Sequence, residues 1–101
     1  MRTLGDALGQ ARMLTNLGAV FASGNRFDEA LAAWRDAIAL QERLDDRVGM
    51  AYTWHHLSDA QWRMDQREAA RASLVTARQL AQELNLISLL GLIDSHPARG
   101  A

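Results

Sequence analysis

The stretches Leu14-Thr15-Asn16-Leu17-Gly18-Ala19-Val20-Phe21 and Ala30-Leu31-Ala32-Ala33-Trp34 decide the fold of this chain. In both, apolar or small residues recur three or four positions apart, which is the spacing of one helix face. Between them stands Gly24-Asn25, a pair suited to a left-handed helix cap. The pattern predicts two helices joined by a short turn, one over about residues 6–23 and one that begins near residue 27.

The same pattern returns 40 positions later. It predicts a second pair of helices over about residues 47–64 and 68–84, and no segment shows the alternation of a strand. The residues that coincide after this shift are mostly small or apolar: Leu4 and Leu44, Asp6 and Asp46, Gly9 and Gly49, Ala11 and Ala51, Leu17 and Leu57, Ala30 and Ala70, Ala32 and Ala72, Ala37 and Ala77, Leu40 and Leu80, and Leu44 and Leu84.

Small residues stand where the two helices of each pair are expected to cross. Ala30 and Ala70 occupy these positions, and Gly18 and Ser58 lie on the facing turn, so that the helices can approach closely. One such hairpin cannot bury its own apolar face and must stack on a neighbour. We therefore expect one domain over residues 1–101: repeat one (4–43), repeat two (44–83), a C-terminal helix (84–94) and a frayed tail (95–101).

These residues resemble the tetratricopeptide repeat, whose pattern is W-x2-L-G-x2-Y followed by A-x3-F and a proline. The first repeat reads Leu14-x2-Leu17-Gly18-x2-Phe21 and Ala30-x3-Trp34; the second reads Trp54-x2-Leu57-Ser58-x2-Gln61 and Ala70-x3-Leu74. Gln61 is polar where the family has an aromatic residue. The terminal proline is absent from both repeats, so the second helix can continue, which accounts for a period of 40.

This longer period is similar to the repeats of kinesin light chains and of many bacterial regulatory proteins. The resemblance covers about residues 4–84. It implies an all-α fold of antiparallel helix hairpins, two repeats and a C-terminal helix, stacked as a short superhelical solenoid. All eleven basic residues are arginine, which indicates a bacterial genome of high GC content.

Composition and motifs exclude several classes of protein. Eleven basic and twelve acidic residues give a net charge of −1, which argues against a nucleic-acid partner. There is no cysteine, no secretion signal and no apolar run near the roughly 20 residues of a spanning helix, so we expect no membrane association and a cytoplasmic protein.

Catalytic and metal-binding patterns are also missing. The sequence contains no phosphate loop, no G-x-S-x-G and no H-E-x-x-H, so we expect neither an enzyme nor a cofactor. His55 and Asp59 lie four apart on a helix, but two ligands without a third are weak evidence for a metal, and we expect none.

The family resemblance implies a binding groove lined by the first helix of each repeat. Carried onto this chain, its residues are Arg12, Thr15, Asn16, Ala19 and Ser23 in repeat one, and Tyr52, His55, His56, Asp59, Trp62 and Arg63 in repeat two. Helical spacing independently places residues 52, 55, 56, 59 and 63 on one face. This mixture of aromatic, imidazole, carboxylate and guanidinium groups suits a peptide.

Taken alone, each groove residue is better explained as a solvated helix position, whereas the face as a whole favours binding. Trp34 and Trp54 take signature core positions, and we expect them to be packing residues. Trp62 either anchors a partner or covers the adjoining turn.

The segment after the second repeat is apolar on nearly all faces of a short helix. It folds back over the second hairpin, docks on another copy of the chain, or begins a further repeat in a longer protein. A large exposed apolar patch usually marks an interface. We therefore expect self-association into a homo-oligomer through Leu86, Ile87, Leu89, Leu90 and Ile93.

The leading functional hypothesis is a non-catalytic module that binds a protein or peptide and acts as a scaffold or adaptor. The alternative is a regulatory or sensory segment of a larger bacterial signalling protein, such as an ATPase-type transcriptional regulator. Two repeats are few for a stable solenoid, which favours either oligomerisation or a longer array.

Overall fold

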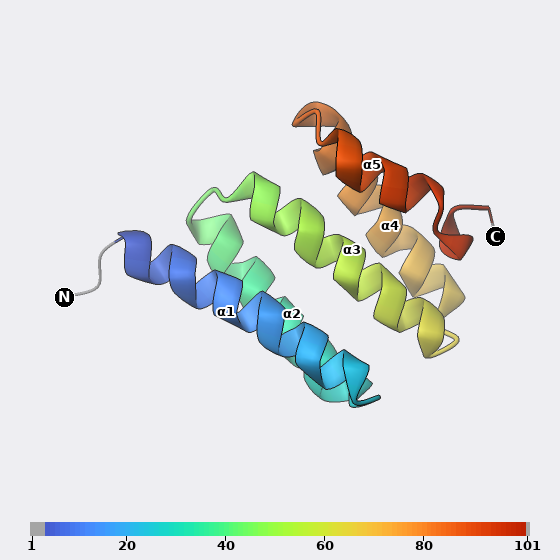
Figure 1. The fold of residues 1–101 in the computed structure, drawn as a ribbon, viewed down its shortest axis with the longest axis horizontal. Coiled ribbons are helices and arrows are strands. Elements are labelled where there is room, and N and C mark those ends of the chain that lie inside the picture. The colour runs from blue at the N-terminus through green and yellow to red at the C-terminus, as the bar shows by residue number, and fades with distance from the viewer. Residues whose placement is uncertain (1–3, 101) are drawn as a thin grey trace.

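The computed structural model describes residues 4–100, and almost all of them are helical (Figure 1). The elements are α1 (Leu4–Ser23), α2 (Phe27–Arg43), α3 (Arg47–Arg63), α4 (Arg67–Glu83), α5 (Ile87–Asp94) and a 3-10 helix (Pro97–Gly100). No strand occurs in this range, which confirms the all-α prediction. Residues 1–3 of the expected domain and residue 101 of the expected tail lie outside the described part.

The helices form two layers. In Figure 1, α1, α3 and α5 lie side by side in one layer, and the paler α2 and α4 lie behind them. The most extensive contacts join α1 with α2, α3 with α4, and α2 with α3. Smaller ones join α4 with α5 and with the 3-10 helix, and α1 with α3. The result is a flat body of 46 × 31 × 18 Å. Stacked antiparallel hairpins were the predicted fold class, and this arrangement confirms it.

The four turns between helices share one geometry. Each contains one residue other than glycine with φ between 53° and 61°, and these residues are 20 positions apart: Asn25, Asp45, Asp65 and Asn85. The N–H of the residue that follows each of them bonds to a carbonyl five positions back, as from Arg26 to Phe21 at 2.8 Å. This is a Schellman cap, and Asn and Asp are the residues that best tolerate it after glycine. Asn25, not Gly24, takes the left-handed position.

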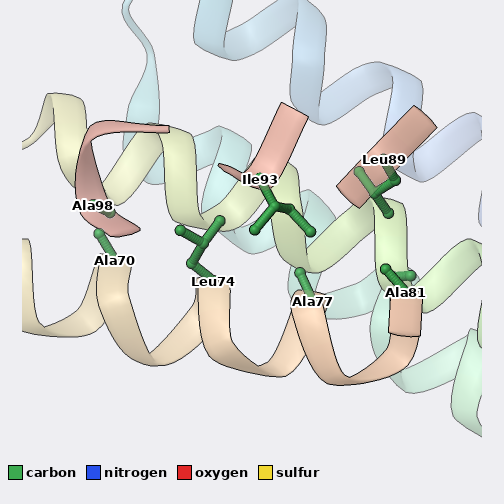
Figure 2. Close-up of a cluster of buried hydrophobic side chains, with 8 residues drawn as sticks. Ala70, Leu74, Ala77, Ala81, Leu89, Ile93 and Ala98 are labelled. Atoms are coloured by element: carbon green, nitrogen blue, oxygen red, sulfur yellow. The ribbon is translucent and has the colours of Figure 1, made fainter. Parts of the chain in front are cut away.

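Two apolar clusters hold the layers together. The first joins α1, α2 and α3 through Ala22, Ala30, Leu31, Trp34, Ile38, Leu57 and Ala60. The second joins α3, α4 and the C-terminal segment through Ala51, Ala70, Leu74, Ala77, Ala81, Leu89, Ile93 and Ala98 (Figure 2). Ala30 and Ala70 are completely buried, as the crossing positions require.

Helix α5 folds back over α4. Leu89 and Ile93 are completely buried, and Figure 2 shows Leu89 beside Ala81 and Ile93 above Leu74 and Ala77. The expectation that these two residues contact another copy is therefore wrong, because their own chain covers them. Leu86 and Leu90 also pack against this cluster. Of the expected self-association set, Ile87 remains exposed.

The last described residues are ordered against the repeat rather than frayed, contrary to the expectation for residues 95–101. Pro97 cannot continue the helical hydrogen bonding of α5, and the chain turns there into the 3-10 helix. Ala98 is completely buried over Ala70, because both side chains are small enough for close approach (Figure 2). Among residues 4–100, no helix has both the length and the apolarity to cross a bilayer.

Candidate functional site

Four of the expected groove residues line one cavity between α1 and α3. These are Arg12, Thr15 and Asn16 from α1 and Tyr52 from α3. The cavity holds about 250 Å³, and we call it the α1–α3 pocket. Its remaining walls are Leu8, Gln41, Asp46, Val48 and Gly49.

Gly49 lets two polar side chains pack closely at the start of α3. A Cβ at this position would lie 2.3 Å from Asp46 Oδ2 and 2.7 Å from Gln41 Nε2. Asp46 is the N-cap of α3, and its Oδ1 accepts a hydrogen bond from the Gly49 N–H at 3.0 Å. Gly9, the equivalent residue in the first repeat, has open space where its Cβ would be, so only Gly49 requires glycine for packing.

Gln41 is the pocket residue that the sequence did not reveal. It is 3% exposed, and its Oε1 has no hydrogen-bond partner within the described chain. The signal was present as a polar residue on the apolar stripe of α2, one turn after Ala37 and Ile38. The repeat gives no support to this signal, because the equivalent residue of the second repeat is Ala81.

Thr15 and Ala19 are tied into the fold. The Thr15 hydroxyl lies 3.1 Å from the Thr53 hydroxyl, and the Thr15 carbonyl accepts a hydrogen bond from Trp34 Nε1 at 2.9 Å. Ala19 packs against the first apolar cluster. Both residues therefore join α1 to its neighbours, which leaves Arg12, Asn16 and Tyr52 as the more available groups at this end of the site.

The second half of the expected groove is a histidine cluster, formed by all three histidines of the chain: His55 and His56 on α3, and His96 after α5. The ring centroid of His55 lies 6.2 Å from that of His56 and 6.0 Å from that of His96. The His56 ring stacks on Trp34 at 5.5 Å, and His96 meets Trp62 edge-on at 6.3 Å.

His96 ties the C-terminal segment to α3. Its Nδ1 accepts a hydrogen bond from the Ala98 N–H at 3.1 Å, so in the neutral ring the proton is on Nε2. That nitrogen lies 3.3 Å from Asp59 Oδ1, and the side chain is only 6% exposed. His96 lies in the segment that was expected to be frayed, and no pattern in the sequence connects it with α3.

The two histidines on α3 favour the neutral form. Burial lowers the pKa of His55, and the nearby His56 and His96 lower it further against the opposing effect of Asp59. Burial likewise lowers the pKa of His56, with Asp59 opposing. These rings therefore offer stacking and single hydrogen bonds rather than charge. Within the described residues, no group of three or more His, Asp or Glu side chains is arranged to hold a metal ion.

Trp62 and Arg63 are the last two residues of α3. The Arg67 guanidinium lies 4.5 Å from the Trp62 ring centroid, so Trp62 covers the turn between α3 and α4. Arg63 lies 5.0 Å over the Phe27 ring and 4.0 Å from Asp59.

Ser23 is exposed at the end of α1, where its hydroxyl donates to the Val20 carbonyl. Trp34 and Trp54 pack in the core as expected.

The tetratricopeptide repeat family model matches residues 2–83 of this chain. The match includes both hairpins and ends with α4, so α5 and the 3-10 helix lie beyond it. No curated protein and no solved structure matches the chain significantly.

Proposed function

We propose that this chain, which belongs to the tetratricopeptide repeat family, binds a peptide segment of another protein on the surface formed by α1 and α3 and serves as a non-catalytic adaptor. The observation that carries this proposal is the state of three side chains beside the α1–α3 pocket. Arg12, Asn16 and Tyr52 make no ion pair or side-chain hydrogen bond within the described residues.

These three groups match what an extended peptide presents. A peptide has backbone N–H and C=O groups along its length, and an Asn side chain can pair with both kinds. An Arg guanidinium binds carbonyl or carboxylate oxygens with charge-assisted hydrogen bonds. A Tyr ring buries apolar area while its hydroxyl stays solvated. The histidine cluster extends this surface along α3 with further rings for stacking.

The test begins with selection of peptides from a displayed random library against the whole chain. Calorimetry then compares the wild type with the double variant Arg12→Ala/Asn16→Ala. Loss of one charge-assisted contact should lower the affinity for the selected peptides about tenfold or more. The matched control is Arg35→Ala, which removes an exposed arginine from the opposite layer and should leave the affinity unchanged. Unchanged affinity in the double variant, with helical content intact, would remove this surface as the binding site.

A second candidate is the regulatory segment of a larger signalling protein, and an apolar face of α1 favours it. Leu17 and Val20 are 42% and 65% exposed, and Met13 is exposed beside them. The equivalent residues of α3, Leu57 and Ala60, are 2% and 1% exposed because α2 covers them. In this function a neighbouring domain would cover α1. Amide hydrogen exchange in α1 should then be slower in the product of the complete reading frame than in this chain, and equal rates would contradict it.

A further inference from the structure

We propose that the α1–α3 pocket recognises a protonated nitrogen group, an ammonium or guanidinium, of the bound peptide. The group belongs to a basic side chain or to the peptide's amino terminus. This inference rests on the proposed function and specifies the chemistry of its ligand.

The inner wall of the pocket presents hydrogen-bond acceptors that lack donors. Gln41 is almost completely buried, and its Oε1 accepts nothing within the described residues. Asp46 uses Oδ1 for the Gly49 N–H, and its Oδ2 accepts no hydrogen bond from that part of the chain. Both side chains pack against Gly49, where the atoms nearest to a Cβ would be Asp46 Oδ2 and the amide nitrogen of Gln41. The acceptors without a donor are thus Gln41 Oε1 and Asp46 Oδ2, and a ligand that satisfies them must bring hydrogen-bond donors.

The charge of Asp46 decides which donor fits. An ammonium has three donors and a guanidinium has five, enough to reach both Gln41 and Asp46, and each is attracted by the carboxylate. A neutral amide lacks that attraction, and the charge of Asp46 would repel a carboxylate. Asp46 is held in place by its capping bond to Gly49, so it is positioned before the ligand arrives.

The mouth of the pocket orients the rest of the peptide. Arg12 is exposed and forms no ion pair within the described residues, so it is placed to bind a carbonyl or carboxylate next to the basic group. Tyr52 also lines the pocket, and an aromatic ring attracts a nearby cation. The expected ligand therefore carries positive charge inside the pocket and an oxygen acceptor at its mouth.

This polar wall lies where the first repeat meets the second, and it does not recur 40 positions later. Forty positions on, Gln41, Asp46 and Gly49 correspond to Ala81, Leu86 and Leu89. There Ala81 and Leu89 are completely buried in the second apolar cluster, with Leu86 packed against it. The helix packing alone does not demand polar groups at these positions, which supports a ligand as the reason for them.

The experiment follows the backbone amide of Gly49 by NMR while the whole chain is titrated with three peptides. The first is Gly-Gly-Lys-Gly-Gly blocked at both ends, the second has norleucine in place of lysine, and the third is amidated pentaglycine with a free amino terminus. A saturable shift with the first or third peptide, and none with norleucine, supports the inference. A shift with the lysine peptide alone identifies a side chain as the source of the cation, and a shift with the third peptide alone identifies an amino terminus.

Two variants test the acceptors. Asp46→Asn keeps a capping oxygen but removes the charge, and Gln41→Met removes Oε1 at similar volume. Each should weaken binding about tenfold. Gln79→Met, on the exposed face of α4, is the matched control and should bind as the wild type does. Equal shifts with lysine and norleucine, or no saturable shift with any probe, would overturn the inference. The inference would also fail if the selected library peptides contain no basic group and bind Asp46→Asn as tightly as the wild type. If the same peptides lose affinity when Arg12 is replaced, the proposed function still stands.

Discussion

The indole of Trp34 lies directly against the backbone of Gly18. A Cβ on residue 18 would lie 2.3 Å from Trp34 Nε1, the same nitrogen that donates to the Thr15 carbonyl of α1 at 2.9 Å. The ring also stacks on His56 of α3, with 11° between the two planes. One side chain of α2 thus contacts both neighbouring helices, and it can do so only because position 18 has no side chain.

Gly18→Ala should therefore destabilise the protein. Overpacking of this kind costs about 1–3 kcal/mol, which outweighs the gain of about 1 kcal/mol that Ala normally brings to a helix. Urea unfolding followed by circular dichroism measures the difference. Gly9→Ala is the control, since its Cβ would meet nothing within 4 Å, and it should gain about 0.5–1 kcal/mol. Equal stabilities of the two variants would contradict the close approach.

Asp45→Gly should stabilise the protein by about 0.5 kcal/mol. The left-handed conformation at Asp45, with φ of 53°, costs a residue with a side chain roughly 1–2 kcal/mol, and glycine avoids this cost while losing more chain entropy. Asp45→Ala should be less stable than Asp45→Gly. At Ala39, in the exposed interior of α2, the order must reverse, with glycine about 1 kcal/mol worse than alanine. Urea denaturation of the wild type, Asp45→Gly, Asp45→Ala and Ala39→Gly provides the test. If glycine and alanine rank in the same order at both sites, the turn geometry is refuted.

Leu89→Ala should loosen α5 far more than Leu92→Ala does. Leu89 is completely buried over α4, and truncation of such a residue costs about 2–5 kcal/mol, whereas Leu92 is 56% exposed and should cost below about 0.5 kcal/mol. Thermal unfolding measures the global effect, and native-state hydrogen exchange of α5 measures the local one. Similar effects of the two substitutions would mean that α5 does not dock as described.

Acidification should destabilise the protein through the histidine cluster. The folded pKa values of His55 and His56 lie below the unfolded value of 6.5, so the unfolded chain binds more protons in the interval between them. Their contribution to the free energy of unfolding is complete above pH 6.5 and is lost as the pH falls through the folded values. Urea unfolding from pH 7 to pH 5 should show this decline.

The double variant His55→Gln/His56→Phe should show a flatter pH dependence. Phenylalanine keeps a ring against Trp34 without a titratable group, and glutamine retains a hydrogen-bonding side chain at the other site. A decline as steep as that of the wild type would assign the pH dependence to other groups.

The family motif predicted individual groove positions with mixed results. Arg12, Asn16 and Tyr52 do line one cavity, because the helix period and the repeat already place them on the inner face of α1 and α3. Ala19, predicted by the same reasoning, packs into the core instead. The period gives a direction around one helix but not the position of the neighbouring helix, and the latter decides whether a side chain reaches solvent.

The sequence by itself determined the helices, their turns and the repeat of 40. These depend on interactions within a few residues: the 3.6-residue period, small residues such as Ala30 and Ala70 at the crossings, and Asn or Asp at each left-handed cap. Only the tertiary structure decided that Gln41 and Asp46 meet Arg12 at one pocket, and that His96 returns to Asp59. Such pairs are far apart in the chain, and their distance depends on how whole helices pack, which no local pattern encodes.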